Sequence, residues 1–528
     1  MRSLYHVGSR GRAIFLFFAA LIAAGHAQTY KVLNSNLGYP WPFIQGTDGN
    51  LYGTTAGGGE ITKLTLAGIL TTVAGIDYGT VAPLVQASDG NFYGTIYTTP
   101  DSDNGAVFQL TPAGVVTTLH TFNWSDGALP RAALVQGTDG ALYSTTDEGG
   151  QYGNGVFFKI TTTGVYTKLY DFGNLSAEPL GVIQGADGNF YGTTYFSAGY
   201  GTVFKITPAG ALTTLHNFSG GTADGARPAV LVQAVNGKLY GTTSGGGANN
   251  LGTIFEITTA GVLTTLHSFS FSDGYNYYAS QMIQATNGNL YGALSAGGAT
   301  ACGEGVGYGC GTIFEITPSG TFSVVHTFTG PYGATPNGLF QDTNGTLYGT
   351  TYYGGPSNYG VFFSLSLGLG AFVNTIPTSG AVGTPITIFG TNLTGATSVS
   401  FNGTPAVFTV ASGTEIATTV PAGATTGKIE VVTPSANLYT NLAPFRVTPS
   451  ITSITPTSGA PGTVLVITGN GFLKASRVTF YKNILASSFT VDSDTQITVT
   501  VPAGAMTGPL QVTTPGGTVT SAGTFTVN

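Results

Sequence analysis

The stretch FYGTTYFSAGYGTVFKITPAGALTTLHNF, residues 190–218, contains the pattern that decides the fold. Short apolar runs alternate with turn segments, and their Thr, Val, Tyr and Phe suit strands better than helices. We expect an LYGTT-type strand, a Gly-rich loop, a GTVFKI-type strand (Gly201–Ile206), a turn at Pro208–Gly210 and an LTTLHNF-type strand (Leu212–Phe218). An ALVQ-type strand, such as Ala133–Gln136, precedes them, so that each unit has four strands.

An anchoring tyrosine marks seven copies of this unit between residues 28 and 370. Successive anchors lie 41 to 57 residues apart, a spacing typical of repeat architectures. Each anchor follows Leu or Phe, and four residues before it stands the Asp or Asn of an Asp-Gly or Asn-Gly pair, the strongest short signal for a hairpin turn. The anchors are Tyr52, Tyr93, Tyr143, Tyr191, Tyr240, Tyr291 and Tyr348.

Four short strands in each of seven units predict an all-β fold, a seven-bladed β-propeller. The alternative, a right-handed β-solenoid, has shorter parallel coils and needs no hairpin in every unit. The seventh unit lacks a TTLH-type fourth strand, and residues 30–33 (YKVL) stand where such a strand would precede the first unit. We expect this fragment to complete the last blade and to close the ring, which removes an exposed sheet edge.

The rest of the chain contains two similar modules, residues 371–448 and 449–528. Each has a PTSG and a VPAG segment within about 80 residues of alternating strands and Pro/Gly turns, which predicts two immunoglobulin-like antiparallel β-sandwiches. The matching segments are Pro377–Gly380 with Pro456–Gly459 and Val420–Gly423 with Val501–Gly504.

Residues 1–27 have the features of a secretory signal peptide. Three arginines precede the apolar run Ala13–Ala24, and Gly25-His26-Ala27 predicts cleavage before Gln28. An uncleaved membrane anchor is the alternative, but the run is short for a span, and no second stretch of about 18 apolar residues follows. Cleavage changes the formal net charge from −7 to −10, because the segment contains three Arg and no acid.

The composition narrows the possible partners. Charged residues make up only 7% of the chain, the net charge is negative, and no basic run occurs, so nucleic acid is a poor partner. The 42% hydrophobic content argues against disorder. We expect no cofactor and no membrane span.

The unit LYGTT…GGxxxGTVFKITPAGxLTTLHxF resembles the GloVer-type tandem repeat of secreted bacterial "choice-of-anchor" proteins, over residues 40 to 367. The two C-terminal modules resemble IPT/TIG immunoglobulin-like domains through PTSG, GTNL/GNGF and VPAG. These resemblances imply a bacterial, extracytoplasmic protein, and they imply no chemistry that can be transferred.

Neither His nor Cys predicts a catalytic or metal site. His120, His216, His267 and His326 occupy one repeat position on the outermost strand, so different blades carry them in different directions and we expect packing roles. Cys302 and Cys310 predict a disulfide in a loop of unit six, with free thiols or a metal pair as alternatives.

Two acidic segments have plainer interpretations than a metal site. Asp101, Asp103 and Asn104 have calcium-like spacing but lack a later bidentate Glu, so a solvated turn is expected. Asp147 and Glu148 are interpreted as a solvated pair. No metal site is therefore predicted.

The binding candidates lie in the loops that connect each unit to the next, because loops on a rigid scaffold usually carry binding residues. Aromatic rings beside carboxylates and Arg suit stacking on a sugar and hydrogen bonding to it. The alternative is that Asp-Gly pairs are turns and that Asp126–Arg131 and Asp224–Arg227 are local ion pairs. The candidates are Trp41, Asp77, Tyr78, Trp124, Asp126, Arg131, Glu178, Asp224, Arg227, Asp273, Tyr275 and Tyr332, with Tyr277 and Tyr278 beside them.

Three functions follow, in this order. The first is a non-enzymatic binding or adhesion protein, with the propeller recognising a glycan or a surface protein and the sandwiches as a spacer. The second is a structural surface-layer or matrix component. The third is a lyase or glycosidase acting on polysaccharide, which would need two carboxylates roughly 5–10 Å apart in the propeller funnel.

Overall fold

The computed structural model describes residues 28–55, 59–76, 82–98, 103–173, 178–196, 199–276, 281–298, 302, 309–441 and 444–528. Among these residues every regular element is a β-strand except one short 3-10 turn, η2 (Tyr481–Asn483), which confirms the all-β class. The predicted signal peptide, residues 1–27, lies outside the described residues.

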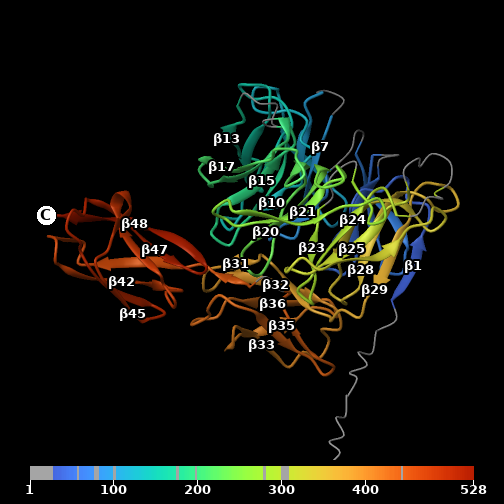
Figure 1. The fold of residues 1–528 in the computed structure, drawn as a ribbon. Helices are drawn as coiled ribbons and strands as arrows, with labels where there is room; N and C mark the ends of the chain where they lie inside the picture. Colours follow the sequence, from blue (N-terminus) through green and yellow to red (C-terminus); the bar gives the residue numbers. More distant parts are fainter. Residues whose placement is uncertain are drawn as a thin grey trace, which may run out of the picture.

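Residues 28–370, here called the repeat region, form seven antiparallel sheets in the described part of the chain (Figure 1). Strands a to d of the first four sheets are β2 (Ile44–Gln45), β3 (Leu51–Thr55), β4 (Glu60–Leu64), β5 (Leu70–Gly75); β6 (Val85–Gln86), β7 (Phe92–Ile96), β8 (Ala106–Leu110), β9 (Val116–Thr121); β10 (Val135–Gln136), β11 (Leu142–Thr145), β12 (Val156–Ile160), β13 (Tyr166–Asp171); and β14 (Pro179–Gln184), β15 (Phe190–Thr194), β16 (Thr202–Ile206), β17 (Leu212–Asn217).

The other three sheets keep the same order of strands. They are β19 (Val232–Gln233), β20 (Leu239–Gly246), β21 (Thr253–Ile257), β22 (Leu263–Ser268), with β18 (Gly225–Pro228) also on β20; β23 (Ile283–Gln284), β24 (Leu290–Leu294), β25 (Thr312–Ile316), β26 (Phe322–Thr327); and β27 (Ala334–Gln341), β28 (Leu347–Tyr353), β29 (Phe362–Ser366), β1 (Thr29–Asn34).

Burial follows the position of a strand in its sheet. Strand b is buried along its whole length in most sheets, because neighbouring sheets pack on both of its faces. Strand d is half exposed, as in β17, because it is the outer edge. One core cluster contains Leu51 of the first sheet with Tyr348 and Phe362 of the seventh, so the ends of the series pack together.

The N-terminal strand takes the place of strand d in the seventh sheet. β1 pairs antiparallel with β29, and its register shift between Val32 and Asn34 matches the shift in strand d of the other sheets. The Tyr30 ring stacks on His326 at 4.0 Å, just as Phe322 stacks on His267 and Tyr166 on His120. In Figure 1 the blue β1 lies beside β29.

A glutamine at the end of strand a links each sheet to the one before it. Its side-chain oxygen accepts a hydrogen bond of 2.8 to 3.2 Å from a backbone N–H in the a–b turn of the preceding sheet. The first sheet bonds in this way to the seventh, so the series is closed. The pairs are Gln86–Thr47, Gln136–Ser88, Gln184–Thr138, Gln233–Ala186, Gln284–Val235, Gln341–Thr286 and Gln45–Thr343.

The connections fall on two faces of the repeat region. The a–b and c–d turns lie at one end of the strands, which we call the turn face. The b–c and d–a loops lie at the other end, which we call the loop face. This separation follows from the antiparallel order a-b-c-d in every sheet.

Residues 371–528 form two further β modules, coloured orange and red in Figure 1. The first contains β30 (Val373–Ile376), β31 (Ser379–Gly380), β32 (Pro385–Gly390), β33 (Ser398–Phe401), β34 (Thr404–Pro405), β35 (Phe408–Val410), β36 (Glu415–Thr419), β37 (Ile429–Val432), β38 (Asn437–Tyr439) and β39 (Arg446–Val447). The second contains β40 (Ser450–Thr455), β41 (Ser458–Gly459), β42 (Val464–Asn470), β43 (Arg477–Phe480), β44 (Ile484–Leu485), β45 (Phe489–Ser493), β46 (Gln496–Thr500), β47 (Gly508–Thr514) and β48 (Gly517–Val527).

The first of these modules, with the linker before it, contacts the turn face. The Arg446 guanidinium donates to the Gly185 carbonyl in the fourth sheet at 2.8 Å, and the Phe372 N–H donates to the Thr343 carbonyl in the seventh at 2.9 Å. The Thr286 hydroxyl of the sixth sheet donates to the Gly370 carbonyl at 3.3 Å. These contacts reach the fourth, sixth and seventh sheets, so the module and its linker occupy part of the turn face.

Candidate functional site

Arg131, Tyr97 and Asp147 form the most connected polar cluster that we find on the loop face. Arg131 follows Pro130 at the end of a d–a loop, and its guanidinium lies over the Tyr97 ring, 4.4 Å from the centroid. The guanidinium also donates to the Tyr97 hydroxyl, and its Nε lies 3.1 Å from Asp147 Oδ2. Arg131 is nevertheless 62% exposed, so part of its donor fork is free to meet a ligand.

Asp147 is buried, so the prediction that Asp147 and Glu148 form a solvated pair is wrong for Asp147. Its residue is 8% exposed, and no described group hydrogen bonds to its Oδ1. Burial raises the pKa of Asp147 to about 7, Arg131 opposes the rise, and Glu178 and Glu148 add to it. The carboxyl group can therefore exchange a proton near neutral pH.

The cluster continues through Glu178 to Arg227. The Tyr195 N–H donates to the Glu178 carbonyl at 3.1 Å, and the Arg227 guanidinium lies 6.0 Å from the Tyr195 centroid and 5.6 Å from that of Phe196. We call Tyr97, Arg131, Asp147, Glu178, Tyr195 and Arg227 the polar arc. It combines residues from the second to the fifth sheet.

A recurrent backbone conformation positions two members of the polar arc. Glu178 and Arg227 each precede a proline and adopt a positive φ, of 38° and 58°. A non-glycine residue rarely adopts this conformation, and the following ring restricts it further. The same device recurs at Tyr39, Leu129 and Thr335.

The loop aspartates do not pair with the arginines, which corrects the ion-pair alternative. Asp126 lies 3.2 Å from His120, Asp224 3.4 Å from His216 and Asp273 3.0 Å from His267. Each also accepts a backbone N–H near the start of its loop, from Asn123, Ser219 and Ser270. These aspartates therefore hold the loop against strand d, and no ion pair among the described residues joins them to Arg131 or Arg227.

His326, the fourth histidine, has Tyr30 as its stacking partner and no carboxylate among the described residues. Burial lowers its pKa to about 4, so this ring is neutral at physiological pH. The described residues contain no group of three or more His, Cys, Asp or Glu side chains that could hold a metal ion.

The predicted aromatic residues differ in exposure. Trp124 is 47% exposed and Tyr332 62%. Tyr275 lies at the Phe271 ring, 6.2 Å between centroids. Trp41 is half-buried, and its indole N–H has no hydrogen-bond partner among the described residues. Trp41 therefore contributes more to packing than to an open surface.

Several sequence predictions concern residues outside the described ranges. Asp77, Tyr78, Asp101, Tyr277 and Tyr278 belong to this group. Cys302 and Cys310 are described and form a disulfide, as predicted.

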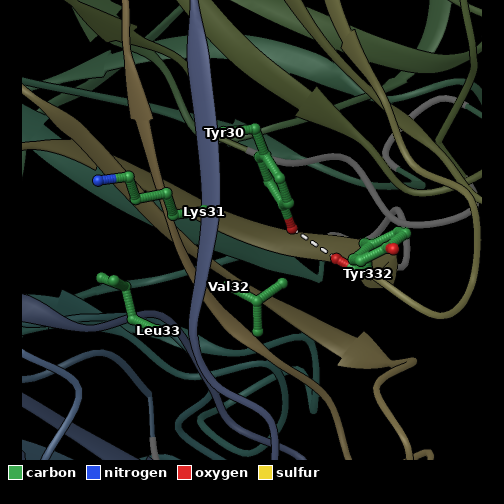
Figure 2. Close-up of a pocket in the computed structure, with 5 residues that line it drawn as sticks. All are labelled: Tyr30, Lys31, Val32, Leu33 and Tyr332. Atoms are coloured by element: carbon green, nitrogen blue, oxygen red, sulfur yellow. Dashed lines mark hydrogen bonds between the residues drawn. The ribbon is translucent and has the colours of Figure 1, made fainter.

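A separate hollow of about 540 Å³ lies along β1 (Figure 2). It is lined by Tyr30, Lys31, Val32, Leu33 and Tyr332, and the Tyr30 hydroxyl donates to the Tyr332 carbonyl at 2.5 Å. Tyr332 is its only member among the predicted binding residues, and the hollow contains no member of the polar arc.

Sequence reasoning missed Tyr97, Asp147 and Tyr195 as members of the site. All three stand four residues after the anchoring tyrosine of their unit, directly beyond strand b or one residue further. The repeat register could have indicated them, because Tyr352 occupies the same position and its ring contacts that of Tyr39, 5.1 Å between centroids.

Comparison with family models identifies both parts of the chain. The Gloeobacter/Verrucomicrobia repeat matches residues 16–178, 80–306 and 178–398, in three overlapping matches. The chain belongs to this repeat family. The IPT/TIG domain matches residues 371–447 and 449–527, which identifies the two C-terminal modules. Together with the disulfide, these families fit a secreted binding or structural protein.

Solved structures offer weaker likenesses. A streptogramin B lyase structure is 17% identical, with a TM-score of 0.48, over 64% of this chain and 98% of that one. Virginiamycin B lyase from Staphylococcus aureus is 16% identical, with a TM-score of 0.47, over 64% and 99%. At these values no chemistry transfers to this chain. No curated protein matches it, and no helix in the described residues is long and apolar enough to cross a membrane.

Proposed function

We propose that this chain is a secreted, non-enzymatic glycan-binding protein whose repeat region is a seven-bladed β-propeller. The closed series of glutamine bonds, from the first sheet round to the seventh, supports seven blades in a ring. In this proposal residues 1–27 are a signal peptide cleaved before Gln28, residues 28–370 are the propeller, and residues 371–448 and 449–528 are two sandwiches that act as a spacer.

The distribution of exposed aromatic rings carries the proposal. Six aromatic side chains of the described repeat region are more than 40% exposed, and all six lie in loops of the loop face. The exposed large aliphatic residues, such as Ile69, Val115 and Val262, all lie in turns of the opposite face. The six are Trp124, Tyr152, Tyr200, Phe271, Tyr332 and Tyr359.

The polar arc complements these rings on the same face. A sugar ring offers an apolar face that stacks on an aromatic side chain, and hydroxyl groups that need both donors and acceptors. Arg131 supplies donors, while Glu178 supplies an acceptor. The first C-terminal module contacts the turn face, so the loop face is the end of the propeller with more room for a long glycan.

A binding experiment tests this function. Residues 28–528 would be screened against polysaccharides and glycoproteins, beside a variant with Trp124, Tyr152 and Phe271 changed to Ala. The matched control has Ile69, Val115 and Val262 changed to Ala on the turn face. We expect the loop-face variant to lose at least tenfold in affinity and the control to bind like the wild type. A wild type that binds nothing would favour a structural role instead.

A specific observation favours a second function, cleavage of polysaccharide. Asp147 has a pKa of about 7, which suits a general acid, and Glu178 lies within electrostatic range of it. Release of reducing ends or unsaturated products by the wild type, and its loss in Asp147→Asn with binding retained, would establish this alternative.

A further inference from the structure

Arg131 and Arg227 are the two arginines of the repeat region, and their side chains lie in similar surroundings. Each guanidinium lies over an aromatic ring that follows strand b of the preceding sheet: Tyr97 for Arg131, and Tyr195 and Phe196 for Arg227. Each arginine also flanks the proline that ends its loop. Both side chains remain exposed, so guanidinium N–H groups are accessible to a ligand.

The two arginines differ in whether a carboxylate neutralises them. Arg131 Nε contacts Asp147 Oδ2 at 3.1 Å. Arg227 is exposed, and none of the described carboxylates lies within ion-pair distance of it. Asp224, three residues earlier, is held instead by the Ser219 N–H at 3.0 Å and the Ser219 hydroxyl at 2.6 Å.

The backbone of Arg227 is anchored, although its guanidinium has no ion-pair partner among the described residues. The Arg227 N–H donates to the Tyr200 carbonyl at 2.7 Å, and the Ser244 hydroxyl donates to the Arg227 carbonyl at 3.4 Å. Pro228 packs so closely on Gly201 that a Cβ there would lie 2.5 Å from the proline Cδ. A ligand would therefore meet a side chain whose base is already ordered, which lowers the entropy cost of binding.

We propose that Arg227, with Tyr195 and Phe196, is a carboxylate subsite that makes the loop face selective for glycans built from uronic acids. This inference rests on the proposed glycan-binding function. The planar guanidinium fork matches a carboxylate with two parallel hydrogen bonds, and the neighbouring rings offer a stacking surface for the sugar that bears it. Arg131, already paired with Asp147, contacts hydroxyl groups.

The overall charge argues for local recognition of this kind. The chain has a formal net charge of −7, so a polyanion receives no general attraction from the protein. Selectivity for carboxylates must then come from a particular unneutralised cation, and Arg227 meets that description on the loop face.

The test compares polymers that differ only in their carboxylates. Affinities of residues 28–528 for polygalacturonate and alginate would be measured beside the same polymers with their carboxyl groups reduced to alcohols. The wild type should bind the carboxylated forms at least tenfold more tightly. Arg227→Gln should lose this preference while keeping the affinity for the reduced forms, and Arg227→Lys should recover only part of it, because lysine lacks the fork.

Arg131→Gln is the matched control. It should weaken binding to the carboxylated and the reduced polymer by similar factors and leave their ratio unchanged. Equal binding of both polymer forms by the wild type, or a preference that survives in Arg227→Gln, overturns the carboxylate subsite and leaves the glycan-binding function standing. Binding to no acidic, reduced or neutral glycan overturns both. Unchanged thermal unfolding of each variant verifies that the fold is intact.

Discussion

The two faces of the repeat region use the same seven units for opposite purposes. On the turn face, the first six units repeat one hydrogen-bonded arrangement of the anchoring tyrosine, an Asp or Asn of the turn and a residue of strand c, and the seventh keeps the bond between the tyrosine and the Asn of the turn. On the loop face, equivalent positions hold Tyr97, Asp147 and Tyr195 in three successive units. The comparison teaches that repetition stabilises the ring, whereas variation at fixed positions creates a surface that can recognise a ligand.

The two faces also differ in their contacts and in the kind of side chain that they expose. The first C-terminal module contacts the turn face through Arg446 and Phe372, while aromatic rings such as Trp124 remain exposed on the loop face. Substitutions on the turn face should therefore change stability and leave binding unchanged. Substitutions on the loop face should do the reverse. The following predictions test this division.

Asp342 should produce the largest effect, because its carboxyl group is fully buried. It is fully buried in the a–b turn of the seventh sheet, and its Oδ2 has no partner among the described residues. Burial raises its pKa to about 6, although the Asn344 N–H bond opposes the rise. The folded state thus holds the proton more tightly than the unfolded chain, so stability falls as the pH rises from about 4 through about 6.

Asp342→Asn removes the pH-dependent loss of stability and keeps a side-chain oxygen that accepts the Asn344 N–H. Its free energy of unfolding should equal that of the wild type near pH 4 and exceed it by about 3 kcal/mol at pH 8. Chemical denaturation at the two pH values checks this prediction. A gain that is the same at both would contradict it.

Gln341→Ala should cost about 2 kcal/mol, because it breaks the link between the sixth and seventh sheets. The Thr286 N–H and the Gly345 carbonyl would both lose a partner in a partly buried turn. Because the Gln341 side chain lies on the turn face, its loss should not change the affinity for the ligand. Gln151→Ala on the exposed loop face is the matched control and should change stability by less than about 0.5 kcal/mol. Equal losses in the two variants would refute the division.

Trp124→Ala should show the reverse behaviour. The indole is exposed, and the bonds of this residue to Gly127 and Gly150 use its backbone carbonyl, which alanine keeps. Unfolding should therefore change by less than about 0.5 kcal/mol, while glycan affinity should fall roughly tenfold, or about 1.4 kcal/mol. Calorimetry of binding and of unfolding on the same samples separates the two effects. A destabilised variant with normal affinity would make Trp124 a structural residue.

The regular part of the fold was largely predictable because it depends on local chemistry. The Asp-Gly and Asn-Gly turns, the period of the anchoring tyrosines and the disulfide all follow from short segments. The length of strand a was not predicted: four residues were expected at Ala133–Gln136, but β10 has only two, whereas β14 has six and β27 has eight. Ser144 Oγ hydrogen bonds to the Ala133 carbonyl there and takes the place of a strand contact.

The site was only partly predictable, because it depends on distances between sheets. Arg131, Glu178 and Arg227 were found as loop residues, but Asp126 and Asp224 were assigned to the wrong partners. The histidines that they contact stand on the preceding strand, six and eight residues earlier, and the local sequence favoured the nearer arginines. The burial of Asp147 depends on neighbours from other units, which no local pattern contains.

The smallest expected effect concerns the turn residue four positions before each anchoring tyrosine, which is Asp in the first four sheets and Asn in the last three. In the first sheet the Tyr52 hydroxyl donates to Asp48 at 2.9 Å, and Lys63 of strand c contacts the same carboxylate at 2.8 Å. In the sixth sheet the turn has Asn287 instead, and the Tyr291 hydroxyl donates to Glu315 of strand c at 2.7 Å. The carboxylate belongs to the turn in the first sheet and to strand c in the sixth, and in both sheets it accepts the hydrogen bond of the tyrosine hydroxyl.

This exchange predicts that the turn residue and the strand c residue can be replaced together but not singly. Lys63→Glu alone would place a second carboxylate beside Asp48 and should cost about 1 kcal/mol, a modest value because both side chains are partly exposed. Asp48→Asn in the same chain recreates the sequence NGNLY with Glu in strand c, as in the sixth sheet, and should restore stability to within about 0.5 kcal/mol. Urea denaturation of the wild type, both single variants and the double variant measures the coupling. A double variant no more stable than Lys63→Glu would show that the arrangement depends on more than the tyrosine's acceptor, whereas recovery would show that the turn face tolerates any sequence that satisfies that bond.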